Sequence, residues 1–340
     1  MRICFTATGS TKCIKPRSMI WRRSVSKALI CLSVLLALMA ATVLIAQKRG
    51  QIAMRKAPQT GEMVTTLSGQ IVHVERYGPE GAPPIVLIHG ASGSTYDMTF
   101  RLAPALAERY RVYVVDRPGF GYSPALSDES LAAQAQTLRE AISELEPRKL
   151  MVLGQSYGGA VALEWALQDQ ENMLGLVLVS AASHEWAGDP SLFYRTMATP
   201  VIGDIFSWML MAYLPSPVLA SEIDAVFAPQ HAPEGYTAFF QPRLSLRPAT
   251  QTLNARQRVT LKAQLRDMTT GYPSLMLPIE SVHGTADTTV GLEVHAAPLA
   301  RDVDSDHLVR LEGLGHMPHH VATQEVVAAV DRLTARLEDR

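Results

Sequence analysis

The sequence predicts an α/β fold, built as a doubly wound, mostly parallel sheet into which a helical cap is inserted. Three observations lead to this prediction. Short apolar runs alternate with longer segments that have helical spacing. One of these runs ends in Gly-x-Ser-x-Gly at residues 154–158, directly before a helix-forming segment. A region rich in proline and aromatic residues, 184–272, then interrupts the alternation.

The chain begins with a basic leader and an apolar segment. Residues 1–27 contain seven Lys or Arg and no acidic residue, and residues 28–46 carry no charge over 19 positions. As a helix, the apolar segment would be about 28 Å long, close to the roughly 30 Å hydrocarbon core of a bilayer. Seven Lys or Arg precede it and four follow it closely, so it predicts an uncleaved single-pass anchor in the inner membrane, with the N-terminus in the cytoplasm and the body in the periplasm or outside the cell.

Alternatives exist for this N-terminal region. A cleaved signal peptide is one, although the apolar run is long for it and no Ala-x-Ala closes the run. Arg22-Arg23 faintly resembles a twin-arginine export signal. Met19 is an alternative start, because residues 1–18 show no periodic pattern. All three cysteines precede residue 47, so the body can form no internal disulfide and no thiolate metal site.

The body of the chain is acidic. Eleven basic residues precede position 57, so 20 of the 31 Lys and Arg remain in the body, against all 32 Asp and Glu. This balance excludes nucleic acid as a partner, and it excludes a body held on anionic lipid by its own surface charge. We therefore expect a monomer that acts on a small molecule and is attached to the membrane by its N-terminal helix.

The elements of the body follow in order. Residues 47–61 are predicted to be a tether, and residues 62–67 and 70–77 alternate as a hairpin does. Buried strands and helices then alternate in two stretches, 62–183 and 273–340, which we assign to the core. Residues 184–272 form the predicted cap, whose apolar side chains are expected to be mainly core. Strands are expected at 85–88, 112–115, 151–153, 173–179, 277–283 and 307–311, and helices at 102–110, 131–145, 160–167 and 324–337.

Ser156 lies at the carboxyl end of a predicted strand, where a sharp turn leads into a helix. Gly154 and Gly158 permit the close approach and strained backbone of a nucleophile elbow. A serine hydroxyl attacks well only with a base, a carboxylate that orients the base, and donors for the oxyanion. Asp287 and His316 follow the last two predicted strands, so the chain order is Ser, Asp, His.

Five segments in this order resemble the α/β-hydrolase superfamily, over residues 62–337. They are His89-Gly90, residues 116–123 (DRPGFGYS), residues 154–159 (GQSYGG), residues 283–287 (HGTAD) and Gly315-His316. The resemblance implies that Ser156 is the nucleophile, His316 the base and Asp287 its orienting acid. It also implies an oxyanion hole made by the backbone N–H groups of Ala91 and Tyr157, with no cofactor and no metal.

Three other polar residues have competing interpretations. Asp116 is an alternative acid, although the superfamily uses this loop aspartate structurally, to pin the turn that begins at Arg117. His319 and His320 could form a metal site with His316, but Pro318 interrupts the run and no matching carboxylate spacing is evident. We expect these two histidines on the solvated surface.

The identity of the nucleophile indicates the reaction. Members of the superfamily that attack saturated carbon use aspartate at the elbow, so Ser156 implies attack on a carbonyl. We predict a carboxylic-ester hydrolase with an acyl-enzyme intermediate, and the Met-rich and aromatic cap favours an apolar acyl or aryl group. A carbon–carbon bond hydrolase, a lactonase, an amidase or a cofactor-free haloperoxidase would use the same triad. A catalytically idle binding relative would normally lack a triad residue, and all three are present.

Overall fold

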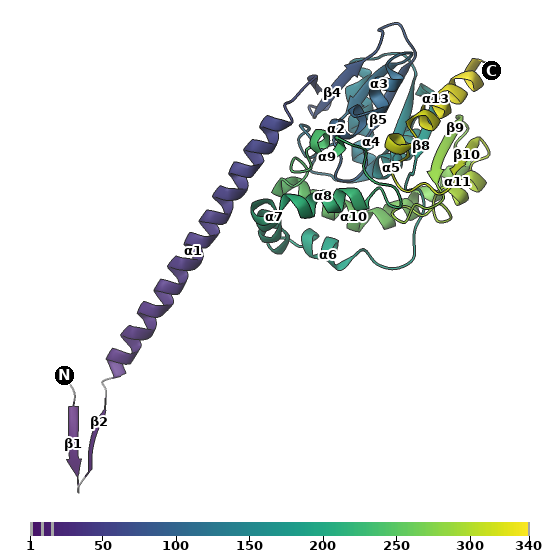
Figure 1. Cartoon of the computed structure of the whole chain (residues 1–340). Helices are drawn as coiled ribbons and strands as arrows, with labels where there is room; N and C mark the ends of the chain where they lie inside the picture. Colours follow the sequence, from purple (N-terminus) through teal and green to yellow (C-terminus); the bar gives the residue numbers. More distant parts are fainter. Residues whose placement is uncertain (1–2, 8–9, 15–16, 339–340) are drawn as a thin grey trace.

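The computed structural model describes residues 3–7, 10–14 and 17–338, with side chains described from residue 26 onward. An α/β body is joined to one long N-terminal helix, α1 (Arg17–Lys56), whose first half runs free of the body (Figure 1). Before α1, the strands β1 (Ile3–Ala7) and β2 (Ser10–Ile14) pair antiparallel. The sequence shows no periodic pattern there, so this pairing was not predicted.

One eight-stranded sheet forms the centre of the body, in the order β10-β9-β8-β7-β5-β6-β4-β3. The pairs from β6 to β10 are parallel, whereas β4 pairs antiparallel with β6 and with β3. The predicted mostly parallel sheet and hairpin are therefore confirmed. The strands are β3 (Glu62–Thr65), β4 (Ile71–Tyr77), β5 (Pro84–Ile88), β6 (Arg111–Val115), β7 (Leu150–Gln155), β8 (Met173–Val179), β9 (Ile279–Gly284) and β10 (Asp306–Leu311).

Helices cover both faces of the sheet, because the central strands are apolar on both faces. Val86 and Ile88 pack toward α4 and α5, while Ile85 and Leu87 pack toward α3 and α13. The core therefore has two apolar layers, one on each face. The helices of the body are α2 (Thr95–Thr99), α3 (Leu102–Leu106), α4 (Leu131–Ser143), α5 (Tyr157–Asp169), α11 (Ala296–Asp302), α12 (Pro318–Val321) and α13 (Thr323–Glu338), with 3-10 turns η1 (Gln170–Asn172) and η2 (Tyr272–Ser274).

Five helices lie between β8 and β9 in the chain and gather at one end of the body (Figure 1). The expectation that their apolar side chains are mainly core is wrong for several of them, since Phe193, Phe206, Met209 and Tyr213 are each about half exposed. The helices of this cap are α6 (Leu192–Ala198), α7 (Ile202–Tyr213), α8 (Ser216–Ala225), α9 (Tyr236–Phe240) and α10 (Pro248–Thr269).

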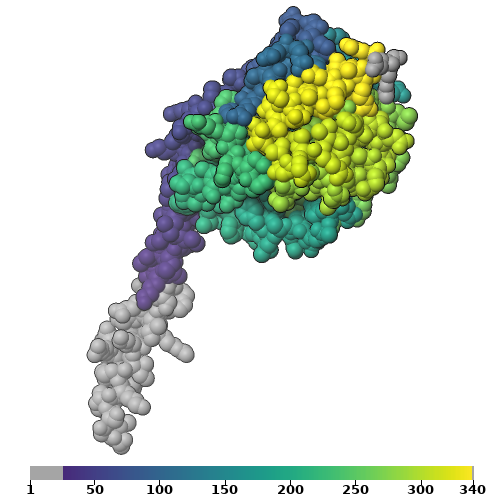
Figure 2. Space-filling model, turned by 45° about the vertical axis from the view of Figure 1, so that its right-hand side comes forward, coloured from purple at the N-terminus to yellow at the C-terminus, as the bar shows by residue number. Residues whose placement is uncertain are grey.

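Helix α1 packs against the cap, which differs from the predicted tether at 47–61. The helix continues to Lys56, and α1 lies alongside the cap segment in both views (Figures 1 and 2). Ala46 is buried against Met211 and Ala212 of α7. Small side chains on α1 allow this close approach, as they do between helices in membranes. Of the residues predicted as a tether, 47–56 therefore belong to a helix that contacts α7, and 57–61 form the link to β3.

Within the described part of the chain, the segment Ser26–Lys56 is long and apolar enough to cross a membrane. Its most apolar window has a mean hydropathy of 2.8, and none of that window is buried by the rest of the protein. An N-terminal helix of this kind can be a membrane anchor or a signal sequence.

Candidate active site

Ser156 occupies the turn between β7 and α5 with φ 53° and ψ −118°, a backbone conformation that non-glycine residues rarely adopt. Both glycines of the motif are required because neither position has room for a side chain. A Cβ added to Gly154 would lie 2.3 Å from the carbonyl oxygen of Gly158, and one added to Gly158 would lie 2.3 Å from that of Ile88. The turn therefore holds the Ser156 side chain at the carboxyl edge of the sheet.

Three of the residues singled out from the sequence form one hydrogen-bonded relay. Ser156 Oγ lies 3.0 Å from His316 Nε2, and His316 Nδ1 lies 2.8 Å from Asp287 Oδ2. With the proton of the neutral imidazole on Nδ1, that nitrogen donates to Asp287, and Nε2 is free to accept from the Ser156 hydroxyl. All three side chains are buried. The arrangement can therefore move a proton from the hydroxyl to the imidazole.

Asp287 is held as a carboxylate by its surroundings. Burial alone would raise its pKa, but hydrogen bonds from His283 and His316 lower the pKa well below the usual range of an aspartate. Its other oxygen, Oδ1, accepts hydrogen bonds from the backbone N–H groups of Thr289 and Val290, at 2.8 and 2.9 Å. These donors fix the orientation of the carboxylate beside His316.

Tyr157 and Ala91 flank Ser156 from two directions. Tyr157 is the first residue of α5, where backbone N–H groups have no partner within the helix. Ala91 lines the same cavity as Ser156 and follows Gly90, which is so close that a Cβ there would lie 3.1 Å from the Cβ of Ser156. The two predicted oxyanion donors are thus near the nucleophile, and their role stays a prediction.

Asp116 has a different set of partners from Asp287. Its Oδ1 accepts from the N–H of Thr95 at 2.7 Å, and its Oδ2 accepts from the N–H of Tyr122 at 2.9 Å and from His73 Nδ1 at 2.7 Å. Its carboxylate is therefore occupied in holding the loops after β5 and β6 together. These contacts favour the structural interpretation of Asp116 over the alternative of a second orienting acid.

Arg117 is a buried cation that the sequence analysis placed only in a turn. Its guanidinium stacks between the rings of Phe120 and Tyr157, 4.3 and 4.4 Å from their centroids. It also donates hydrogen bonds to the carbonyl oxygens of His89 and Gly90, both at 3.1 Å. Burial lowers the pKa of Arg117 to about 10. The residue thus ties the loop after β5 to the helix that begins beside Ser156.

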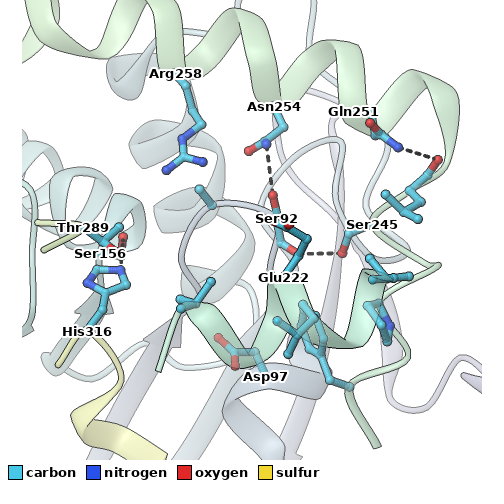
Figure 3. A pocket seen from close by; sticks show the side chains of 18 of the residues that line it. Ser92, Asp97, Ser156, Glu222, Ser245, Gln251, Asn254, Arg258, Thr289 and His316 are labelled. Atoms are coloured by element: carbon cyan, nitrogen blue, oxygen red, sulfur yellow. Dashed lines mark hydrogen bonds between the residues drawn. The ribbon is translucent and has the colours of Figure 1, made fainter. Parts of the chain in front are cut away.

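A cavity of about 570 Å³ lies between the cap and the edge of the sheet, with Ser156 and His316 in its wall (Figure 3). Its lining is mostly apolar, and the cap helices α6 to α10 and the segments between them supply the larger part of it. Arg258 of α10 reaches into it and stacks on the Tyr194 ring, 4.4 Å from the centroid. Sequence reasoning missed this residue, because nothing in the sequence shows which face of a cap helix turns inward. The polar side chains of the lining include Ser92, Asp97, Glu222, Ser245, Gln251, Asn254, Arg258 and Thr289.

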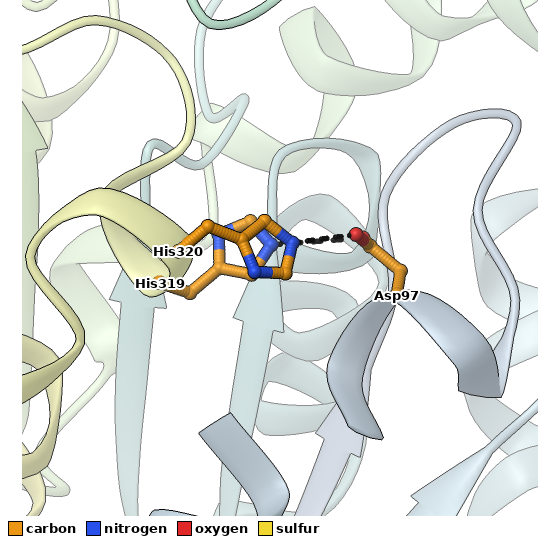
Figure 4. A group of neighbouring side chains, drawn as sticks. All are labelled: Asp97, His319 and His320. Atoms are coloured by element: carbon orange, nitrogen blue, oxygen red, sulfur yellow. Dashed lines mark hydrogen bonds and ion pairs between the residues drawn. The ribbon is translucent and has the colours of Figure 1, made fainter. Parts of the chain in front are cut away.

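The expectation that His319 and His320 lie on the surface is wrong, because both are fully buried. Pro318 begins the short helix α12, which turns both rings toward Asp97 (Figure 4). His320 Nε2 lies 2.8 Å from Asp97 Oδ1, and the Tyr236 hydroxyl of the cap donates to the same oxygen at 2.7 Å. The ligand atoms of the two histidines and Asp97 lie within 4.8 Å of one another, close enough to hold a metal ion.

The burial of this group controls its charge. Burial lowers the pKa of His320 to about 4, so this imidazole is neutral at pH 7. Burial opposes ionisation of Asp97 as well, but the His319 ring, whose Nε2 lies 3.6 Å from Asp97 Oδ2, and the hydrogen bond from His320 hold the pKa of Asp97 well below the usual value. The contacts are those of a network in which a buried carboxylate joins α2, α12 and the cap.

A strained serine elbow on a doubly wound sheet, with a histidine and a carboxylate at the neighbouring strand ends, defines a class of hydrolases. The chain belongs to the Alpha/beta hydrolase family, which it matches over residues 85–329. It is 30% identical over 267 residues to the pimeloyl-[acyl-carrier protein] methyl ester esterase of Aeromonas hydrophila. The aligned region covers 76% of this chain and 98% of that protein. The resemblance drawn from the sequence motifs is therefore confirmed at the level of the family.

Solved structures share the fold. A putative lipase from Acinetobacter baumannii AYE superposes with a TM-score of 0.64 at 22% identity, over 86% of this chain and 97% of that one. An esterase from Exiguobacterium antarcticum superposes with a TM-score of 0.65 at 20% identity, over 81% of this chain and 100% of that one. The protein is an enzyme of the hydrolase class, and ester hydrolysis is the activity that the names of its relatives support.

Proposed function

We propose that the protein hydrolyses carboxylic esters through a triad of Ser156, His316 and Asp287. The observation that carries the proposal is the relay of two hydrogen bonds, 3.0 and 2.8 Å long, that ends at a strained serine in a cavity wall. A relay of this kind activates a hydroxyl that is otherwise a weak nucleophile. The esterase name of the Aeromonas relative favours an ester over the other carbonyl substrates.

The reaction begins when Ser156 Oγ attacks the ester carbonyl carbon and His316 Nε2 takes the hydroxyl proton. The negative charge that develops on the carbonyl oxygen is stabilised by the N–H groups of Tyr157 and Ala91. The intermediate collapses as the bond to the alcohol oxygen breaks, and His316 returns its proton to that oxygen. An acyl-Ser156 ester remains, and the alcohol leaves.

Water then repeats the sequence on the acyl-enzyme. His316 takes a proton from the water as its oxygen attacks the acyl carbon, and then gives that proton to Ser156 Oγ as the acyl bond breaks. The carboxylic acid leaves, and the serine is restored. Asp287 stays ionised throughout, because its hydrogen bonds lower its pKa. Its negative charge stabilises the imidazolium that forms on His316 in each half-reaction.

The lining of the cavity favours an apolar acyl or aryl group. Met197, Leu210, Leu214 and Phe240 are among the apolar side chains that line the same cavity as Ser156. Burial of apolar ligand surface against them stabilises the complex without requiring polar partners. A lactone, an amide, a carbon–carbon bond substrate or a haloperoxidase reaction would use the same relay, and a binding protein without activity would not need it.

We also propose that α1 is retained as a single-pass anchor, with the hydrolase on the outer side of the inner membrane. The seven basic residues before residue 28 support this orientation. Retention is supported by the contacts of Thr42 and Ala46 with the cap, which cleavage after the apolar segment would remove. Alkaline phosphatase fused after Arg340 should be active in bacteria, and a cytoplasmic reporter at the same place silent. The reverse result would put the hydrolase in the cytoplasm.

A fluorophosphonate probe followed by a panel of esters tests the reaction. The probe should label the wild-type protein at Ser156 and leave Ser156→Ala unlabelled, because the reagent reacts only with an activated serine. Esters of graded acyl length should then show a preference for the longer apolar groups. Absence of labelling in folded wild-type protein would favour the idle binding relative.

A further inference from the structure

Helix α7 carries a row of exposed apolar side chains at positions i, i+3, i+4, i+7 and i+11. These are Ile202, Ile205, Phe206, Met209 and Tyr213, which are between 46% and 51% exposed. We call this row the apolar stripe of α7. A surface helix normally turns such a row toward the core. The apolar stripe of α7 faces outward instead, which indicates that a membrane or another apolar surface covers it.

The last residue of this stripe, Tyr213, contacts α1 near the end of its uncharged segment. The hydroxyl of Tyr213 lies 2.8 Å from Thr42 Oγ1, inside the uncharged segment 28–46, and Arg49 Nη1 donates to the carbonyl oxygen of Leu214 at 3.2 Å. Thr42 precedes the first charged residue, Lys48, by six positions, which is about 9 Å along a helix. Helix α7 therefore lies where the apolar part of α1 gives way to charge, the position of a bilayer surface on a spanning helix.

The rest of the body is consistent with this position. Helices α6 and α7 lie on the side of the body toward which the free N-terminal half of α1 runs (Figure 1). Asp204 is the one charged residue of α7. The body as a whole is acidic, so anionic lipid would not attract it. Apolar contact and the basic residues of α1 would instead hold this surface at the membrane.

The cavity is lined in part by exposed apolar residues of the cap helices next to α7. Phe193, Val218 and Val226 line the cavity and are also 53%, 44% and 36% exposed. Leu210 of α7 and Leu214, which directly follows α7, also line the cavity. Helix α7 is thus a wall with the cavity on one side and the apolar stripe on the other. An apolar ester reaching the cavity from lipid would not have to cross water.

We infer that the apolar stripe of α7 is embedded in the bilayer surface and that the substrate is an ester dissolved in the membrane, which enters the cavity between α6 and α8. The inference rests on the proposed ester hydrolysis and on the proposed anchor. It adds the source of the substrate and a second membrane contact that the sequence analysis did not include.

Two substrates with the same leaving group separate membrane entry from catalysis. Full-length protein in phosphatidylcholine vesicles is assayed with 4-methylumbelliferyl oleate, which partitions into lipid, and with the water-soluble 4-methylumbelliferyl acetate. The double variant Ile205→Gln/Phe206→Gln should lower kcat/KM for the oleate by about tenfold or more, since burial of even one such side chain can account for that factor. It should leave the acetate unchanged.

Leu67→Gln and Met276→Gln are the matched controls, because these apolar residues are 87% and 74% exposed at other places on the body. Neither control should change either rate. Equal effects of the α7 variant on both esters, or no effect on the oleate, would overturn the inference.

A nitroxide label gives a second readout that does not require activity. After Cys4, Cys13 and Cys31 are replaced by serine, a label at position 205 should be accessible to oxygen, which concentrates in lipid, and protected from a water-soluble nickel complex. A label at position 67 should show the opposite accessibility. If the wild type hydrolyses neither ester, the proposed function fails, and the label at position 205 still decides whether the stripe lies in lipid.

Discussion

Arg117 Nη2 donates a hydrogen bond to the carbonyl oxygen of Gly90 at 3.1 Å. The peptide unit that holds this carbonyl also holds the N–H of Ala91, and the two groups point in opposite directions because the unit is planar and trans. By holding the carbonyl on its own side, Arg117 directs the N–H away from itself. The orientation of one proposed oxyanion donor therefore depends on a buried cation that follows the neighbouring strand, β6.

We expect Arg117→Lys to lower kcat by about tenfold or more, because an ammonium group cannot reproduce the spread of the guanidinium over the carbonyls of His89 and Gly90. The unfolding free energy should fall too, so rates are compared at a temperature where circular dichroism shows the variant to be folded. An unchanged kcat in the folded variant would mean that Arg117 does not position the donor.

Ser156→Ala and His316→Ala should each lower turnover of an ester by about 10⁴-fold or more, because each removes an end of the same relay. The double variant should be no worse than the singles, since the two residues act as a unit. Thermal unfolding should stay near that of the wild type. Substantial hydrolysis by purified Ser156→Ala would exclude the proposed nucleophile.

Asp287→Asn should lower kcat by up to about 10⁴-fold, because the amide no longer holds the imidazole in the required tautomer. No rescue by Asp116 is expected, since its oxygens already accept from Thr95, Tyr122 and His73. Ester turnover by the variant between pH 6 and 9 checks this. A residual rate within tenfold of the wild type would show that another carboxylate serves His316.

Stability should fall as the pH is lowered from about 6.5 to about 4. Burial lowers the pKa values of His89, His295 and His320 to about 4, so in this range the unfolded chain binds three protons that the folded chain does not. Burial raises the pKa of Asp306 to about 6, which offsets one of them. Urea unfolding at pH 7.5, 6 and 5 measures the slope. A stability that rises on acidification would contradict the neutral state of these histidines.

Asp97→Ala should destabilise the protein by about 2–5 kcal/mol, because it leaves two buried polar groups, the neutral His320 imidazole and the Tyr236 hydroxyl, without their shared hydrogen-bond partner. The exposed pair of Asp224 and His231 has the same 2.8 Å contact and serves as the control. Asp224→Ala should leave the urea midpoint unchanged. Equal shifts of the two midpoints would mean that burial does not set the strength of these pairs.

Strand pattern and motif order were sufficient to predict the sheet and the residues of the relay. The short apolar runs at 85–88, 112–115, 151–153 and 173–179 proved to be strands buried in the sheet, and His316 could be recognised because it follows the final strand. These features are local in the chain or depend on the order of its elements.

The features that could not be predicted depend on contacts between distant segments. His320 is buried because a carboxylate 223 positions earlier lies beside it. Arg258 reaches the cavity because α10 packs over it, and the helix at 47–56 is supported by contacts such as the hydrogen bond from Arg49 to the Leu214 carbonyl oxygen. In each case the local sequence is equally compatible with a solvated surface or a loop.

The uninterrupted course of α1 into its contact with α7 has a mechanical consequence. A spanning helix tilts when the thickness of the bilayer changes. Because α1 is one unbroken helix from residue 17 to residue 56, a tilt of its apolar segment would move Ala46 against Met211 and Ala212, and so would move α7 beside the cavity. The width of the cavity would then depend on membrane thickness, and so on the lipid composition of the membrane that holds the enzyme.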